Sequence, residues 1–395
     1  MMIRATLSNP KDKNCSPVSI CFPIKDCAEI YSKLRAIGIG SAIERDCFVS
    51  EINSDYCPIL KRLEQIVVNV DELDYLAKRL DSFDKHEIAK FQGMTVIRGY
   101  DDITDLINLT FCCQASTVIQ DFTDLTAVGR EHYMDIHGGV TEEELKMIDF
   151  QMTALSLILN EVGNITPYGV IYENGVCLEQ IYDGQHFPDY DYDSESVMVV
   201  AMSDRNEPEE SASVTWLYLP MQAYQIDRSM FRAGIYTYND MLLQVERSKL
   251  FPQIDNLISA GNLSLNHLNE LCIDFKDLDQ GSMKKFEAVL QMTEPSSISE
   301  VSNLIKQLDL FEFIPGVFTP EEYGRHMIKE SGHFQYDGEL DEFYDFKKYG
   351  NRQIENEQGQ FTPNGYVSYH GFLSIKEVMT GSQTECMEMG GMQLK

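Results

Sequence analysis

Two short stretches of this sequence, 196 residues apart, carry the same pattern. Residues 163–170 read GNITPYGV and residues 359–366 read GQFTPNGY, so Gly, Thr-Pro and a second Gly recur at one spacing. Pro and Gly in this arrangement are typical of a turn that sets off short strands. The same local structure is therefore predicted twice, which indicates an internal repeat.

The repeat extends over most of the chain. At shifts of 195 to 197 residues, the matches run in order without a long gap, and chance supplies only two or three of them. Upstream, Pro23 matches Pro220 and Arg35-Ala36 matches Arg232-Ala233. The later matches pair Leu73, Leu76 and Leu80 with Leu268, Leu271 and Phe275, Phe91 with Phe286, Gly129-Arg130 with Gly324-Arg325, and Asp149-Phe150 with Asp345-Phe346.

Each copy is predicted to have three sections, and the fold class predicted is α+β. Apolar runs at Val18–Ile24 and Val214–Met221 are rich in β-formers and precede helical stretches. Leucines at three- and four-residue spacing then predict helices, and Thr319-Pro320 begins another. We expect an elongated row of small mixed and helical modules, present twice. The expected domains are 1–205 (1–60 α+β, 61–115 helical, 116–205 acidic α+β) and 206–395 (206–260 α+β, 261–312 helical, 313–395 α+β).

The chain is strongly acidic, and the acidity is uneven. Sixty-three Asp and Glu against 32 Lys and Arg give a net charge of −31. Residues 1–100 hold 14 acidic and 14 basic side chains, whereas residues 101–212 hold 23 and three, a net of −20. With 43% hydrophobic residues the chain is not a disordered acidic tail. Such a field repels nucleic acid and anionic membranes and attracts basic surfaces.

Residues 183–195 are the most distinctive acidic stretch. Asp189, Asp191 and Asp193 alternate with Tyr190 and Tyr192. In an extended chain these carboxylates would share one face about 6–7 Å apart, which could imitate part of a phosphate row. Two other interpretations stay open: a calcium loop, although the spacing of an EF-hand is absent, and a solvated linker between the copies. Glu207, Glu209 and Glu210 follow shortly after.

The sequence gives little sign of catalysis, metal binding or membrane insertion. It lacks the Gly-x-Ser-x-Gly, phosphate-loop and His-Glu-x-x-His motifs. The ten cysteines have no zinc-type spacing and are expected to be reduced thiols in the cytoplasm. No apolar run is long enough to cross a membrane. We therefore expect no enzyme, no cofactor and no metal; a hydrolase or metal-dependent enzyme is the least favoured alternative.

The second copy closes with a recognisable order of motifs. Residues 321–325 read EEYGR, residues 328–332 read IKESG and residues 343–350 read FYDFKKYG, with a last strand predicted within Gly359–Tyr369. This order resembles the closing section of the ArdA antirestriction family. Phe22-Pro23-Ile24, followed by a helix and a Leu-rich helical part, resembles the family's opening.

The resemblance implies a function that suits the charge. ArdA proteins are DNA mimics, usually dimers, that occupy the DNA-binding surface of type I restriction–modification enzymes. The expected partner is therefore such an enzyme, with no nucleic acid and no membrane as partner, and a homodimer is one expected assembly. An acidic adaptor for another basic DNA-handling or mobile-element protein is the alternative function.

Eighteen carboxylates are the candidate partner-binding residues. Those assigned through the family motifs are Asp124, Glu131, Asp135, Glu142, Glu143, Glu144 and Asp149 in the first copy, with Glu321, Glu322, Glu330, Asp341, Glu342 and Asp345 in the second. Those added from the alternating stretch are Asp183, Asp189, Asp191, Asp193 and Glu195.

Three departures from the family are evident. The chain has two copies where the usual member has one, and residues 1–100 are neutral. The first copy also lacks Tyr349-Gly350, with Leu155 or its neighbours at that place.

Overall fold

A computed structural model describes residues 2–12, 14–138, 140–208, 213–260, 264–333 and 335–381. The protein is mixed α and β, as predicted, and its described strands form four small antiparallel sheets. Two compact units divide the chain. The first comprises Met1–Ser194, Met202–Trp216 and Ala223–Leu242, and the second comprises Glu195–Ala201, Leu217–Gln222 and Leu243–Lys395.

The first copy begins with a four-stranded sheet and a helical section. The sheet has the order β2-β1-β3-β4. Its strands are β1 (Ile3–Ser8), β2 (Val18–Phe22), β3 (Cys47–Ser54) and β4 (Val67–Val68), with α1 (Cys27–Ala36) between β2 and β3. The helices that follow are α2 (Val70–Asp81), α3 (Lys85–Arg98) and α4 (Ile103–Leu109). The predicted leucines Leu73, Leu76 and Leu80 are fully buried in the core that joins them.

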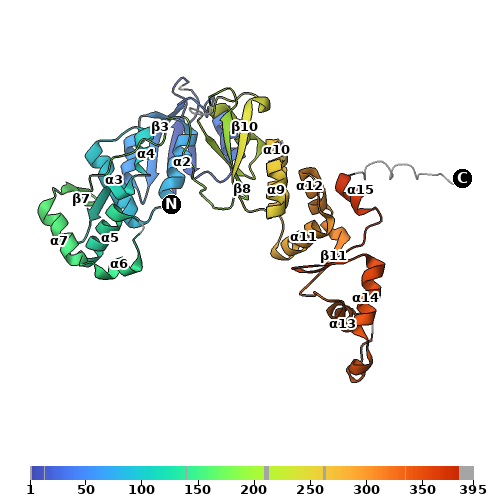
Figure 1. Cartoon of the computed structure of the whole chain (residues 1–395). Helices are drawn as coiled ribbons and strands as arrows, with labels where there is room; N and C mark the ends of the chain where they lie inside the picture. Colours follow the sequence, from blue (N-terminus) through green and yellow to red (C-terminus); the bar gives the residue numbers. More distant parts are fainter. Residues whose placement is uncertain are drawn as a thin grey trace. The chain divides into compact units, whose positions relative to one another are not determined.

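A three-stranded sheet and three helices complete the first copy. The sheet has the order β5-β7-β6 and contains β5 (Ser116–Ile119), β6 (Asn164–Thr166) and β7 (Gly169–Glu173). The helices α5 (Leu125–His137), α6 (Glu142–Met147) and α7 (Phe150–Asn160) lie between β5 and β6 in sequence. Figure 1 shows the three helices next to one another, in green, beside β7.

A similar order of elements returns in the second half of the chain, with α9 in place of β4 and without a counterpart of α6. A sheet of order β10-β8-β9 comes first, and a sheet of order β11-β13-β12 comes last, matching β5-β7-β6 strand for strand. The strands are β8 (Met198–Asp204), β9 (Thr215–Leu219), β10 (Met241–Ser248), β11 (Phe311–Pro315), β12 (Gln360–Thr362) and β13 (Gly365–Tyr369). The helices are α8 (Ala223–Arg232), α9 (Pro252–Ala260), α10 (Leu265–Lys276), α11 (Gln280–Thr293), α12 (Ile298–Lys306), α13 (Pro320–Lys329), α14 (Phe346–Glu357) and α15 (Ile375–Thr380).

The Thr-Pro-x-Gly pattern forms the same turn twice. The hydroxyl of Thr166 donates to the carbonyl of Gly169 at 2.8 Å, and Thr362 does the same to Gly365 at 2.8 Å. Both glycines have positive φ, 134° and 147°, a region open to glycine and costly for other residues. The turn therefore fixes β6 on β7 and β12 on β13.

Two helix pairs cross at backbone contact. A Cβ on Gly324 of α13 would lie 2.0 Å from the carbonyl oxygen of Phe346, and one on Gly350 of α14 would lie 1.8 Å from that of Pro320. In the first copy a Cβ on Gly129 would lie 1.7 Å from the carbonyl oxygen of Phe150. Glycine is therefore needed at Gly129 and Gly324, the place in the crossing where both copies have it.

The first copy has the same helix crossing although it lacks the Tyr-Gly pair of the second copy. Asp149 and Asp345 both cap helices, which aligns α7 with α14 at a shift of 196. The equivalent of Gly350 is then Ala154, which is fully buried next to Gly129. The expected replacement was Leu155 or one of its neighbours, and the structure has the neighbour Ala154 at this place. The crossing is a packing feature common to both copies.

Two further observations bear on the class of protein. The nine cysteines in the described ranges are free thiols. Among the residues that the structure describes, none of the helices has both the length and the apolar character needed to cross a membrane.

The glycine crossing gives a test of the fold. We expect Gly324→Ala to destabilise the second unit by about 1–3 kcal/mol, because the new methyl would lie 2.0 Å from the carbonyl oxygen of Phe346 and must displace backbone rather than a flexible side chain. Gly281→Ala is the matched control, since Gly281 lies in α11 and its Cβ would meet nothing closer than 3.5 Å. Urea denaturation followed by far-UV circular dichroism measures both; equal midpoints for the two variants would contradict the crossing.

Candidate functional site

The acidic section contains exposed carboxylates on and around three short helices. Asp124 caps α5 by accepting from the backbone N–H of Ala127 at 3.0 Å, and Asp149 caps α7 by accepting from Met152 at 3.1 Å. Both side chains are exposed. Capping uses one oxygen and leaves the charge in place, so these residues still add to the surface field.

Helix α6 carries the least engaged of the candidates. Glu144 forms a capping box with Thr141, which lowers the pKa of the Glu144 carboxyl through hydrogen bonds from the backbone and side chain of Thr141. Glu142 and Glu143 are exposed and make no hydrogen bond or ion pair with any residue that the structure describes. Their carboxylates are therefore available to an external cation.

Two of the candidates on α5 face inward. The ammonium of Lys90, whose side chain is only 5% exposed, lies 2.7 Å from Glu131 and 2.6 Å from Asp135. His86 also contacts Glu131. Burial raises the pKa of Glu131, but hydrogen bonds from His86 and Lys90 outweigh it and the pKa falls. These carboxylates pair with a buried lysine and are only partly exposed, so we expect them to present less charge to a partner than the exposed candidates do.

The alternating stretch is not an extended strand. No residue from 183 to 195 is in a strand, all of them lying within the described chain. Aromatic contacts hold the segment on α2 instead: the ring of Phe187 stacks on Tyr75 at 4.6 Å, and the hydroxyl of Tyr190 donates to the carbonyl of Lys78 at 3.3 Å. The predicted row of carboxylates on one extended face is therefore replaced by an irregular segment whose tyrosines anchor it.

The carboxylates of this stretch have different surroundings. Asp189 and Asp193 are exposed, and Asp191 is half-buried. Asp183 accepts from the ring of His186 at 2.8 Å, and Glu195 pairs with Lys276 at 3.0 Å. Glu207 is exposed, and Glu209 and Glu210 lie outside the described residues.

The candidates in the second copy are largely engaged. Glu321 lies 3.4 Å from Arg325, and Glu330 lies 2.9 Å from the ring of His326. Asp341 lies 2.6 Å from the ammonium of Lys329. Glu322 and Asp345 cap α13 and α14. Glu342 alone of these six is exposed without a hydrogen bond or ion pair to the described residues.

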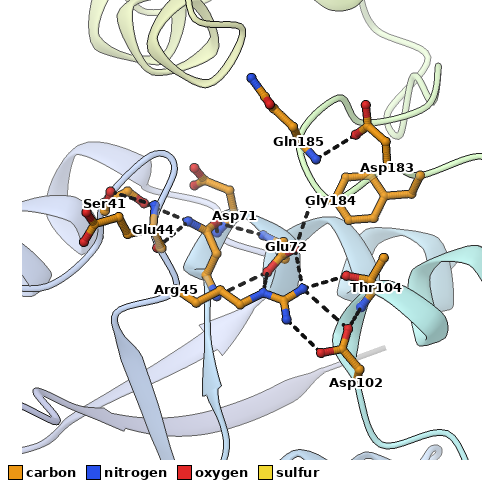
Figure 2. A network of polar contacts seen from close by, with 12 residues as sticks. Ser41, Glu44, Arg45, Asp71, Glu72, Asp102, Thr104, Asp183, Gly184 and Gln185 are labelled. Carbon is orange, nitrogen blue, oxygen red and sulfur yellow. Dashed lines mark hydrogen bonds and ion pairs between the residues drawn. The ribbon is translucent and has the colours of Figure 1, made fainter.

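A partly buried polar network pairs charges within the first 102 residues. Arg45 is bound by both oxygens of Glu72 at 3.1 Å and by Asp102 at 2.7 Å, as Figure 2 shows. Glu72 is 1% exposed. Ion pairs of this kind bring opposite charges of the section together, and this reduces the electrostatic field that they produce at the surface.

Helix α8 contributes two arginines to the same unit. Arg228 lies 2.7 Å from Asp71. Arg232, 5% exposed, donates to the side chain of Asn69 at 3.2 Å and to the carbonyl of Gln185 at 2.7 Å. Sequence reasoning matched Arg232 to Arg35 but missed this role, because Arg35 is exposed and only the tertiary contact distinguishes them.

An open groove of about 1700 Å³ also lies in the first unit. Its lining carries both signs of charge, with Lys25 and Lys85 close in sequence to Asp26 and Asp84. Mixed charge of this kind gives no single-sign field, and so the groove does not extend the acidic surface.

Comparison with known proteins does not assign this chain to a family. Neither the protein-family models nor the curated proteins searched give a match to this chain.

The two kinds of glutamate predict two kinds of variant. Glu131→Gln should lower the free energy of unfolding by about 1–3 kcal/mol at pH 7, because Lys90 loses a charged acceptor. The pKa of Glu131 is lower in the folded protein than in the unfolded chain, where it is about 4.3. The ionised carboxylate therefore stabilises the fold at pH values above about 4.3, and this stabilisation is lost as the pH falls through the folded-state pKa. The difference from wild type should therefore shrink below pH 4. Glu143→Gln should change stability by less than about 0.5 kcal/mol.

Urea denaturation at pH 7 and pH 3.5 provides the measurement. Equal effects of Glu131→Gln and Glu143→Gln at pH 7 would show that the inward pairing is not formed.

Proposed function

We propose that this protein is an antirestriction DNA mimic that binds the DNA-binding surface of a type I restriction–modification enzyme and inhibits it competitively. The observation that carries the proposal is the section 101–212, with a net charge of −20, whose glutamates Glu142 and Glu143 are exposed and unpaired in the described chain. The motif order that resembles the ArdA family gives the partner class.

The physical basis is replacement of phosphates by carboxylates. A DNA-binding groove is lined with Lys and Arg, and Asp and Glu accept charge-assisted hydrogen bonds from both, in bidentate form from Arg. Each such contact takes a cation that DNA would use. Binding should therefore exclude DNA, be steered over long range at low salt and weaken as salt screens the charges.

The acidic surface proposed is narrower than the sequence suggested. Its members are the exposed carboxylates of the first copy, and Glu131 and Asp135 are excluded because they pair with Lys90. We assign to the mimic surface Asp124, Glu142, Glu143, Glu144 and Asp149, with Asp189 and Asp193 as further exposed acids. Among the six candidate carboxylates of the second copy, only Glu342 combines exposure with the lack of a described partner.

An acidic adaptor for a different basic protein is the second candidate. The same unpaired glutamates support it, because a basic surface of any origin would attract them. In either case we propose that the protein acts in the cytoplasm, where DNA-handling enzymes have their substrate.

The charge variants test the proposal. Wild-type protein should inhibit DNA cleavage by a type I enzyme, and inhibition should be overcome by excess DNA and fade as salt rises. Glu142→Gln with Glu143→Gln should weaken inhibition about twofold to thirtyfold at low salt, since two rim charges are worth about 0.2–1 kcal/mol each.

The control removes the same charge elsewhere. Glu51→Gln with Asp55→Asn neutralises two exposed acids of the neutral section and should leave inhibition unchanged. If wild-type protein inhibits none of a panel of type I enzymes, the mimic function is wrong. Equal losses for both double variants would instead show a general charge effect without a located surface.

A further inference from the structure

Helix α7 exposes an apolar face within the acidic section. Met152 is 59% exposed, Leu159 is 78% exposed and Val162, just past the helix, is 85% exposed. Met152 and Leu159 are seven residues apart and so lie on one side of the helix, together with half-buried Leu155. The opposite side packs inward through Ala154 and Leu157, both buried. We call Met152, Leu159 and Val162 the α7 outer face.

The second copy shows that the fold does not require this face to be apolar. Helix α14 has the same place in the repeat, the same capping Asp and the same close helix crossing. At the positions equivalent to the α7 outer face it has Lys348, Glu355 and Gln358. Lys348 and Glu355 are exposed. The same backbone is therefore compatible with a polar surface, and the apolar side chains of the first copy need another explanation.

The surroundings of the face are acidic. Four exposed acids are close to this face in the sequence. Three precede it, at Glu142, Glu143 and Asp149, and the fourth, Glu161, lies between Leu159 and Val162. An apolar centre with a charged, solvent-accessible rim is the usual composition of a protein–protein interface. Duplex DNA offers no such apolar surface, so charge mimicry alone does not account for it.

We propose that the α7 outer face is the apolar centre of the interface with the basic partner, and that it takes an apolar patch set among the partner's Lys and Arg side chains. This inference rests on the proposed function. The acidic rim attracts a basic surface and brings the apolar groups together. Two other occupants are disfavoured by the negative charge around the face. An anionic membrane would be repelled, and a second molecule of this protein would bring two sections, each with a net charge of −20, against each other.

The consequence is affinity that salt does not remove. Salt screens the carboxylates, whereas burial of apolar surface does not depend on the ionic atmosphere. The partner should stay bound at salt concentrations at which DNA dissociates from it. The face also adds selectivity, because a basic surface without a matching apolar patch gains only the charged contacts.

The experiment transfers the second copy's own residues onto the first. Met152→Lys, Leu159→Glu and Val162→Gln together copy Lys348, Glu355 and Gln358, and they leave the net charge unchanged. The dissociation constant for the type I enzyme is measured by calorimetry from low to high salt. The triple variant should bind at least about tenfold more weakly at every salt concentration, with the same salt slope as wild type.

Two comparison variants define the effect. Glu142→Gln with Glu143→Gln should reduce the salt slope and keep the residual affinity at high salt. Ile43→Gln with Phe372→Gln removes exposed apolar side chains elsewhere, at 51% and 109% exposure, and should bind like wild type. Circular dichroism and sedimentation velocity check that each variant is folded and report its assembly state.

Each remaining outcome has one meaning. If wild type inhibits the enzyme and the triple variant binds it equally well, the inference is overturned while the proposed function stands. If the triple variant changes the sedimentation of the free protein from dimer to monomer, the face joins two copies and the inference is overturned. If wild type binds no type I enzyme, the proposed function fails, and this inference fails with it.

Discussion

Repulsion among carboxylates is the constraint on which this structure depends. Residues 101–212 hold 23 acidic side chains and three basic ones, so internal pairing cannot neutralise them. The fold uses acids as helix caps at Asp124 and Asp149, and it directs Glu131 and Asp135 to the one lysine, Lys90, that α3 buries nearby. The acids left over face solvent. A folded domain tolerates such a surplus, and a basic partner would relieve it.

The two copies show how one backbone can serve two surfaces. Both keep the Thr-Pro-x-Gly turn and the helix crossing at Gly129 and Gly324, because these depend on backbone geometry. The exposed sides of α7 and α14 have no such constraint and differ in character. In the second copy three of the candidate carboxylates lie next to Arg325, His326 and Lys329. The neighbouring basic groups weaken the negative field of these carboxylates. The proposed partner surface is therefore concentrated in the first copy.

Local features of the fold could be predicted from sequence, and tertiary ones could not. Thr319-Pro320 begins α13, Leu73 and Leu76 are buried, and the strands at β2 and β9 lie within the predicted runs, since these depend on capping, periodicity and β-propensity. The inward turn of Glu131 depends on Lys90, 41 positions away in sequence, which no local pattern reveals. The alternation around Asp191 leaves an extended row and a solvated linker both open, because the contacts of Tyr190 and Phe187 with α2 depend on tertiary structure.

The central claim is that this protein and DNA compete for one surface. The most direct measurement is displacement of a fluorescent DNA duplex from a type I enzyme, followed by anisotropy without cofactors for cleavage. We predict complete displacement, with a midpoint that rises in proportion to the DNA concentration once the DNA exceeds its own dissociation constant. A ternary complex, with anisotropy above that of the enzyme–DNA complex, would contradict the claim.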